Sequence, residues 1–129
     1  MHALASLTPV TRQPPRIVSE SFRRDQSERR PISFRHFVLV PATRTLLHRG
    51  RPVEIGGRAF DLLLVLLRAR GAIVSKAEIM RHVWPSIFVD EGNLRFQMAM
   101  LRKALGEDRD LIKTVTGRGY LVIDERDGF

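Results

Sequence analysis

The chain has 129 residues, which suits one domain, and its 22 Lys and Arg residues outnumber its 14 Asp and Glu residues to give a net charge of +8. This charge favours a polyanionic partner and argues against an acidic interaction module. The absence of cysteine excludes disulfide bonds, thiolate metal sites and cysteine nucleophiles, and it fits a reducing compartment.

Arginine supplies most of the positive charge. Only Lys76, Lys103 and Lys113 are lysines, so 19 of the 22 basic residues are arginines. Arginine forms bidentate contacts with phosphate and guanine, although a GC-rich coding sequence would also enrich it. Residues 1–30 hold six Arg and three acidic residues, a charge of +3, and residues 31–129 carry the remaining +5. The charge is therefore not confined to a tail.

The first 30 residues contain three prolines and no hydrophobic period. We expect residues 1–30 to form a flexible basic arm with a helical turn near residues 19–27. The opening MHALASLTPV does not have the pattern of a signal peptide. The longest apolar run, AFDLLLVLL at 59–67, is too short to span a bilayer. We expect a soluble cytoplasmic protein with no membrane partner.

Three short segments from Ile32 onward are typical of β-strands. They are ISFRHFVLV, TRTLLHRG and RPVEIG, separated by Pro41–Ala42 and by Arg49–Gly50–Arg51. The pattern predicts an antiparallel meander with Gly50 in a turn.

Two helices are predicted next. The segment GRAFDLLLVLLRARG is apolar nearly all round, which indicates a central helix, and Gly71 is expected to close it. The segment SKAEIMRHVWP begins with Ser75 and Glu78, the pattern of a capping box, and stops at Pro85. Its inner stripe is predicted to be formed by Ile79, Val83 and Met80.

A third helix is predicted from about 91 to 105, capped by Asp90 and ended by Gly106. Its apolar stripe is Leu94, Met98, Leu101 and Leu105. The remaining face is a mixture of donors, cations and hydrophobic side chains: Asn93, Arg95, Phe96, Gln97, Met100, Arg102 and Lys103.

A β-hairpin follows a polar loop. The strands LIKTV and GYLVI are joined by TGRG at 116–119. Gly117 and Gly119 permit a tight turn and place Arg118 at its most exposed point. An ordinary surface turn with one arginine would have the same sequence.

The order sheet, helix, helix, helix, hairpin predicts an α+β winged helix-turn-helix, in which the third helix enters a DNA major groove. Arg95 can then bond guanine, Gln97 can pair with adenine, and Phe96 or Met100 can touch a thymine methyl group. Arg102 and Lys103 would meet phosphates, and Arg118 a minor groove. The alternative is a solvated helix whose Phe96 and Met100 pack on the sheet or on a partner helix.

Residues 34–123 resemble the winged-helix effector domain of OmpR/PhoB-type response regulators and of ToxR/CadC-like transcription regulators. The matching segments are VEIGGRAFDLLLVLL, GAIVSKAEIMRHVWP, VDEGNLRFQMAMLRKALGED and IKTVTGRGYLV. The resemblance implies an N-terminal four-stranded antiparallel sheet, three helices and a C-terminal hairpin, or wing, that pairs with a strand near Ile73. The domain would span residues 31–125, followed by a C-terminal tail at 126–129.

The resemblance also implies the DNA-binding residues. On the recognition helix they are Asn93, Arg95, Phe96, Gln97, Met100 and Arg102, and on the wing they are Thr114, Thr116, Arg118 and Tyr120. Trp84 matches a position near a phosphate, but a place at the core edge fits equally well. Lys76 would reach a phosphate or remain solvated.

The loop at 85–92 corresponds to the segment that contacts RNA polymerase in some activators of this family. Ser86, Ile87 and Phe88 are the candidate contacts, with inward packing of Phe88 or Val89 as the alternative.

Several positions depart from the family pattern. Basic residues are common in response regulators where Ala99 and Met100 stand, so specificity would depend more on Arg95, Gln97 and the wing. Gly56 and Asp61 replace the usual cap and Glu of the first helix, which is closer to the ToxR-like branch. The sequence contains no receiver domain, so a sensor or receiver would act from another chain, unless this chain is part of a longer regulator.

The predicted function is sequence-specific binding of double-stranded DNA by a transcriptional regulator at the bacterial nucleoid. A dimer on tandem half-sites about 10–11 bp apart is expected because one small domain buries limited surface. The alternative is a winged helix used for protein contact, with Phe96 and Met100 at the interface. The histidines are scattered and no phosphate loop is present, so we expect no enzyme activity, no cofactor and no metal.

Overall fold

The computed structural model describes residues 29–123, and the chain divides into two units between Arg30 and Pro31. The predicted N-terminal arm lies outside the described residues except for its last two positions, and the helical turn predicted near 19–27 and the tail at 126–129 lie wholly outside them. These domain assignments stay predictions.

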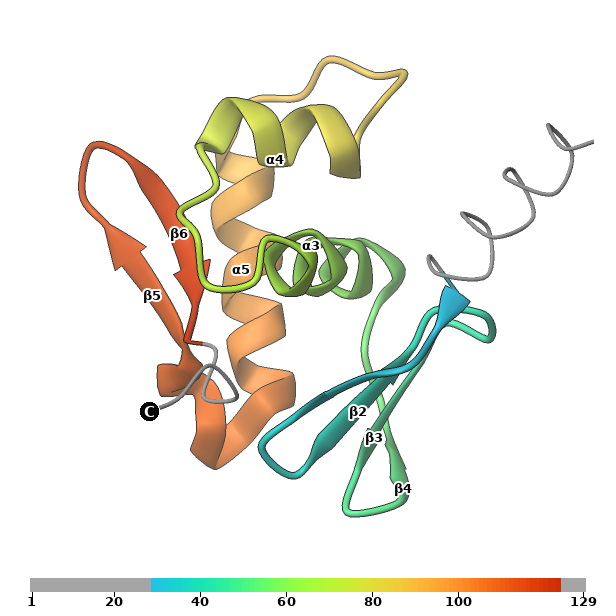
Figure 1. Ribbon diagram of the computed structural model, residues 1–129. Helices are drawn as coiled ribbons and strands as arrows, with labels where there is room; N and C mark the ends of the chain where they lie inside the picture. Colours follow the sequence, from blue (N-terminus) through green and yellow to red (C-terminus); the bar gives the residue numbers. More distant parts are fainter. Residues whose placement is uncertain (1–28, 124–129) are drawn as a thin grey trace, which may run out of the picture. The chain divides into compact units, whose positions relative to one another are not determined.

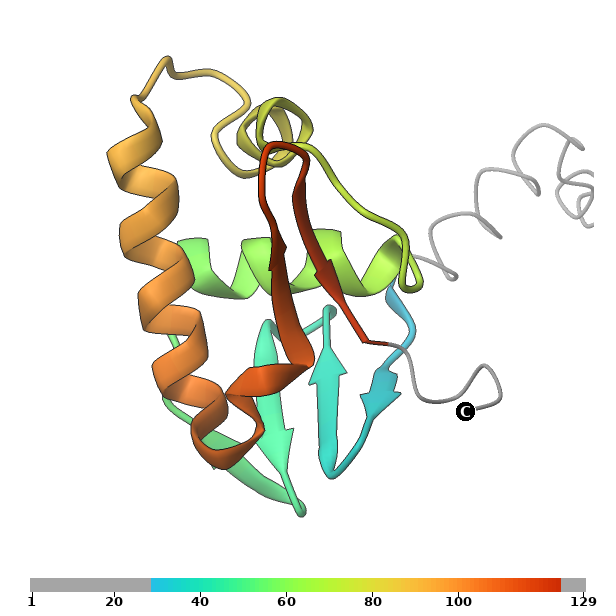
Figure 2. The same ribbon diagram turned by 90° about the vertical axis from the view of Figure 1, so that its left-hand side faces the viewer.

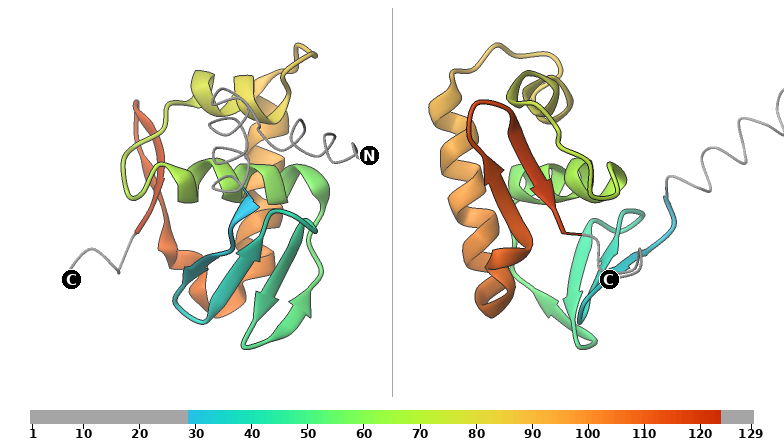
Figure 3. Two further views of the ribbon diagram at one scale, coloured as in Figure 1. Left: turned by 45° about the vertical axis from the view of Figure 1, so that its right-hand side comes forward. Right: turned by 60° about the vertical axis from the view of Figure 1, so that its left-hand side comes forward.

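Four antiparallel strands form the N-terminal sheet, in the order β1-β2-β3-β4 (Figures 1 and 3). Their bounds are β1 Ile32–Phe34, β2 Phe37–Val40, β3 Thr45–His48 and β4 Arg51–Val53. The four-stranded sheet implied by the family resemblance is confirmed.

The strand pattern alone was wrong in treating ISFRHFVLV as one strand. Arg35 has a φ of 53° and begins a turn, so Phe34 pairs with Phe37 across it. The two phenyl rings stack with centroids 5.1 Å apart, which fixes the turn against the core. A run of apolar residues can thus conceal a hairpin.

The predicted turn at Gly50 is confirmed. His48 pairs with Arg51, leaving Arg49 and Gly50 as a two-residue loop with φ values of 52° and 84°. Positive φ at both positions is the requirement of a type I′ turn, whose twist matches that of the flanking strands.

α3 (Gly57–Arg68) is the central helix of this unit. Figures 1 and 2 show it between the sheet on one side and α4 on the other, with α5 crossing it. Its buried side chains are Ala59, Phe60, Leu62, Leu63, Leu66 and Leu67. The prediction of a core helix is confirmed.

The predicted end of α3 at Gly71 was wrong. The helix ends at Arg68, and the N–H of the C-cap residue, Ala69, bonds the carbonyls of Leu66 and Leu67. Gly71 lies in the turn that follows, with a φ of 88° after Arg70 at 52°. The chain leaves the helical conformation before the glycine, because two consecutive positive φ values cannot continue an α-helix.

α4 (Lys76–Val83) begins as predicted, since the Ser75 hydroxyl accepts the Glu78 N–H at 3.1 Å. The Glu78 carboxylate lies 3.7 Å from Arg81, so it pairs along the helix. Ile79 and Val83 are fully buried and Met80 is half-buried, which confirms the inner stripe.

α5 (Glu91–Leu105) has the predicted bounds and caps. Asp90 accepts the Gly92 N–H at 2.9 Å, and the Gly106 N–H bonds the last-turn carbonyls. The predicted apolar stripe is confirmed as the buried face: Leu94, Met98, Leu101 and Leu105.

The segment predicted as a polar loop forms a 3-10 helix, η1 (Gly106–Leu111), with Leu111 buried. The hairpin follows as β5 (Ile112–Val115) and β6 (Gly119–Val122). Val74 and Tyr120 form a single β-bridge, with N···O distances of 2.8 and 3.0 Å. The predicted pairing of the hairpin with a segment near Ile73 is therefore confirmed, as a single bridge at the next residue, Val74.

One hydrophobic core joins the sheet, the helices and the hairpin. Leu39 and Leu46 from the sheet, Met98 from α5 and Val122 from the hairpin all belong to it. Among residues 29–123 no polar or charged residue is buried. The chemistry available in this region therefore lies at its surface.

Gly119 is required by the bridge to Val74. Its φ is 146°, and a Cβ built on it would lie 2.0 Å from the Val74 carbonyl oxygen. Gly117 has a φ of 77°, but nothing lies within 4 Å of its Cβ position. Gly119 permits a close approach of two backbone segments, whereas Gly117 supplies only a turn conformation.

Replacing Gly119 with alanine should lower the free energy of unfolding by roughly 3 kcal/mol, because it combines backbone strain with displacement of the bridge. In the matched Gly117→Ala variant the free energy of unfolding should fall by only about 1 kcal/mol, because alanine is strained at a positive φ. Urea unfolding followed by circular dichroism measures both changes. Equal losses in the two variants would contradict the close-approach explanation.

Candidate nucleic-acid interface

The face of α5 opposite the core is a side-chain ridge open to solvent. Phe96 is 61% and Met100 40% exposed, and the side chain of Arg95 is 67% exposed. Asn93 and Lys103 are exposed as well. The alternative in which Phe96 and Met100 pack on the sheet is therefore wrong.

Glu91 lies between two of the predicted DNA-binding cations. Its carboxylate is 3.7 Å from the Lys76 ammonium and 3.5 Å from the Arg95 guanidinium, and all three side chains are well exposed. Exposed ion pairs of this kind contribute about 0–1 kcal/mol. A phosphate or a base edge can therefore displace Glu91 from either cation at little cost.

Arg102 connects α5 to the hairpin. Its side chain donates from Nη2 to the Ile112 carbonyl at 3.1 Å and to the Thr114 hydroxyl at 3.0 Å. We expected both Arg102 and Thr114 to meet DNA, but the structure occupies this nitrogen within the chain. Arg102 lies on a helix and Thr114 on a strand, so neither the helical nor the strand periodicity of the sequence could predict this contact. It is seen only in the tertiary structure.

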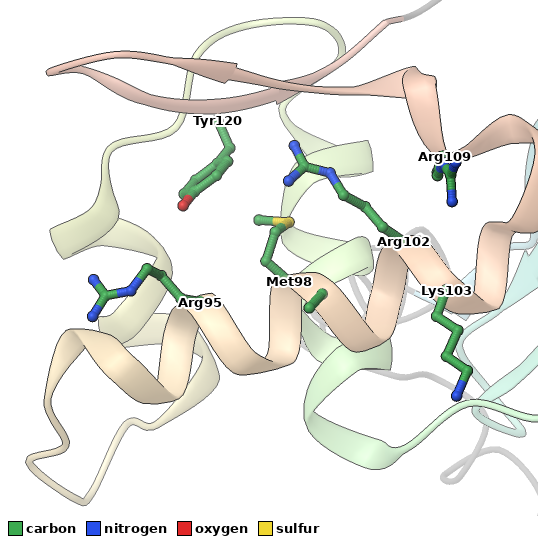
Figure 4. A pocket seen from close by; sticks show the side chains of 7 residues that line it. Arg95, Met98, Arg102, Lys103, Arg109 and Tyr120 are labelled. Atoms are coloured by element: carbon green, nitrogen blue, oxygen red, sulfur yellow. The ribbon is translucent and has the colours of Figure 1, made fainter.

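Trp84 and Tyr120 are buried, with 8% and 6% of their surface exposed. Figure 4 shows Tyr120 pointing from the hairpin toward α5, between Arg95 and Met98. The structure therefore places both rings with the core, and the contact of Tyr120 with DNA stays a prediction. A buried ring positions the hairpin and offers little surface to a ligand.

A groove of about 520 Å³ runs between α5, η1 and β6 (Figure 4). Its charged lining residues are all basic: Arg95, Arg102, Lys103 and Arg109. Among the described residues that line it, none is acidic, so the groove concentrates positive potential. Sequence reasoning missed Arg109, because the acidic residues of GEDRDL conceal one arginine that the 3-10 helix presents to the groove.

The wing tip carries Thr116 and Arg118, both exposed. The turn is closed by the Arg118 N–H, which bonds the Val115 carbonyl at 2.8 Å. Figures 1 and 2 show this loop at the end of the domain where α5 begins. The tip and the first turns of α5 are thus available to one extended ligand.

The connection between α4 and α5 exposes a second apolar surface. Ile87 is 57% and Phe88 97% exposed, and Ser86 is exposed beside them. Val89 packs against the core. Of the two inward-packing alternatives, the one for Phe88 is wrong and the one for Val89 is confirmed.

In the region 29–123 no three His, Asp or Glu side chains are grouped closely enough to hold a metal ion. No helix within these residues is long and apolar enough to cross a bilayer.

Thr114→Val should speed amide hydrogen exchange in β5 and β6 about fivefold, because it removes one hydrogen bond worth about 1 kcal/mol between Arg102 and the hairpin. Thr116→Val, at the exposed tip, is the matched control and should leave exchange unchanged. Mass spectrometry of the exchanged protein measures both. Unchanged protection in Thr114→Val would show that this bond does not hold the hairpin.

A family model described as the C-terminal domain of transcriptional regulatory proteins matches residues 50–122. The transcriptional regulator HilA of Salmonella typhimurium is 33% identical over 96 residues, which cover 70% of this chain and 17% of HilA. The chain thus matches less than a fifth of that relative's length.

Two solved structures have the same fold. The RstA DNA-binding domain of Klebsiella pneumoniae, in complex with the RstA box, is 25% identical with a TM-score of 0.63, and the match covers 72% of this chain and 96% of that one. The DNA-binding domain of Escherichia coli CadC is 26% identical with a TM-score of 0.64, over 73% of this chain and 92% of that one. The predicted winged-helix fold is confirmed.

Proposed function

The chain belongs to the OmpR/PhoB-type family of transcriptional regulators that this C-terminal domain defines, and from that membership we propose that residues 31–125 bind double-stranded DNA sequence-specifically to regulate transcription. The observation that supports this most directly is the basic groove between α5 and the hairpin. The RstA domain of the same fold was solved with its DNA box.

The proposed docking places α5 in the major groove, which accepts one α-helix. The wing tip would then reach the neighbouring minor groove or backbone. Because the tip and the first turns of α5 lie at one end of the domain, a single duplex can meet both (Figure 2). Arg118 at that tip suits a narrow minor groove, where the negative potential is enhanced.

Individual residues receive different roles in this proposal. Arg95, Asn93 and Gln97 supply hydrogen bonds to base edges, and Lys103 and Arg109 meet phosphates. Thr116 adds a hydroxyl group at the wing tip, and Lys76, at the start of α4, reaches a DNA phosphate. Arg102, Thr114 and Tyr120 hold the wing against α5.

Phe88 and Ile87 favour a second contact, to a protein. Nearly complete exposure of a phenylalanine is unfavourable in water and marks an interaction surface when neighbouring apolar groups are exposed with it. We propose that Ser86, Ile87 and Phe88 contact RNA polymerase during activation. A winged helix that binds only proteins remains the competing function.

The family is one of DNA-binding domains, and binding of DNA requires no enzymatic step and no cofactor. We place the protein in the bacterial cytoplasm at the nucleoid. It would act on tandem half-sites as a dimer, with its input supplied by further segments or a separate sensor.

Selection from random duplexes should yield a preferred binding site, and the affinity of the protein for this duplex should fall steeply as the salt concentration rises. If about six phosphates are neutralised, log affinity should fall with log salt at a slope near −5. Fluorescence anisotropy at several salt concentrations measures the slope. Binding that is absent, or insensitive to salt, would favour the protein-contact function.

Arg118→Ala should weaken binding to the selected duplex about tenfold, because it removes a cation from the wing tip. Arg51→Ala, an exposed arginine of β4 in the N-terminal sheet, is the control of equal charge and should bind as the parent does. Gln97→Ala should change base preference more than affinity. Identical affinity and selection in Arg118→Ala and Gln97→Ala would refute the docking.

A further inference from the structure

We propose that α5 recognises thymine through its 5-methyl group, so that the selected DNA carries thymines where it faces Phe96, Ala99 and Met100. This inference rests on the proposed DNA-binding function and adds the chemistry by which sequence is read. It concerns the part of α5 that protrudes farthest from the core.

The middle of this ridge is apolar. At 100° per residue, positions 96, 99, 100 and 103 lie opposite the buried stripe of α5. Phe96 is 61% and Met100 40% exposed, and Ala99 is exposed between them. Lys103 comes only at the far end. Phe96, Ala99 and Met100, the side chains in the middle of the ridge, therefore carry no hydrogen-bonding group.

The polar side chains of α5 lie on the flanks of this apolar crest, and several are engaged within the chain. Arg102 bonds the hairpin, whereas Arg95 forms only an exposed pair with Glu91, 3.5 Å away, which a base edge can displace. Asn93 lies in the first turn, with its side-chain amide 3.5 Å from Asp90. Hydrogen-bond readout is thus confined to the edges of the contact, and another kind of readout must serve its centre.

The major groove offers one apolar feature, the methyl group on C5 of thymine. Thymine presents this methyl group beside its O4 acceptor, whereas guanine, adenine and cytosine present only acceptors or an amino group as readable features. A phenyl ring or thioether pressed against those polar groups would remove water without replacing its hydrogen bonds. Contact with thymine is favourable, because burying its methyl group removes apolar surface from water. The chemistry of the crest therefore selects thymine.

The central experiment uses duplexes selected from a random pool and replaces each thymine singly with deoxyuridine. This change deletes the methyl group and keeps every hydrogen-bonding group. At the thymines that face the crest, binding should weaken about fourfold for each methyl lost. Replacing such a T·A pair with 5-methylcytosine·guanine should cost less than replacing it with cytosine·guanine.

The contact is assigned to side chains by combining the DNA change with protein variants. Phe96→Ala and Met100→Ala should each abolish the thymine preference at one position, which is a coupling that a double-mutant cycle isolates. Phe88→Ala removes another exposed phenyl ring, outside α5, and should preserve the preference. Circular dichroism confirms that each variant is folded.

The possible results separate this inference from the function beneath it. Equal binding of thymine and deoxyuridine duplexes would overturn methyl readout while leaving DNA binding intact. A thymine preference that survives in both Phe96→Ala and Met100→Ala would overturn the assignment to the crest. If no duplex is selected at all, both proposals fail, and the protein-contact function is favoured.

Discussion

The attachment of the hairpin to the helices is the constraint on which the rest of the interface depends. Two backbone hydrogen bonds between Val74 and Tyr120 attach β6 beside α4, and they can form only because residue 119 has no side chain. The Tyr120 ring then packs toward α5, and Arg102 reaches from α5 to β5. Backbone, ring and guanidinium together set the width of the basic groove.

The sequence predicted most of the fold because its signals were local. The caps Ser75, Asp90 and Gly106 and the buried stripe of α5 depend on neighbouring residues, and each appeared where expected. The errors have the same origin. The apolar run around Arg35 concealed a turn, and the helix before Gly71 ended earlier than predicted. Both differences come from a positive backbone φ value, at Arg35 and at Arg70, which depends on tertiary packing and cannot be predicted from hydrophobic periodicity.

The candidate site was less predictable, because its residues come from segments that only the fold brings together. The exposure of Arg95 and Phe96 followed from helical spacing. The contact of Arg102 with Thr114, the burial of Tyr120 and the place of Arg109 in the groove did not, since each requires the hairpin and η1 to be positioned against α5. The family resemblance pointed to one surface, most of whose residues are exposed, but it could not show that Arg102 bonds the hairpin or that Tyr120 is buried.

The bond from Arg102 to Thr114 has a thermodynamic consequence for complex formation. Because the hairpin is already fastened to α5 in the free domain, association does not have to order it, and that part of the conformational entropy is lost during folding. The heat-capacity change on association should then reflect the apolar area covered by the ligand, without the additional contribution of a segment that folds on contact.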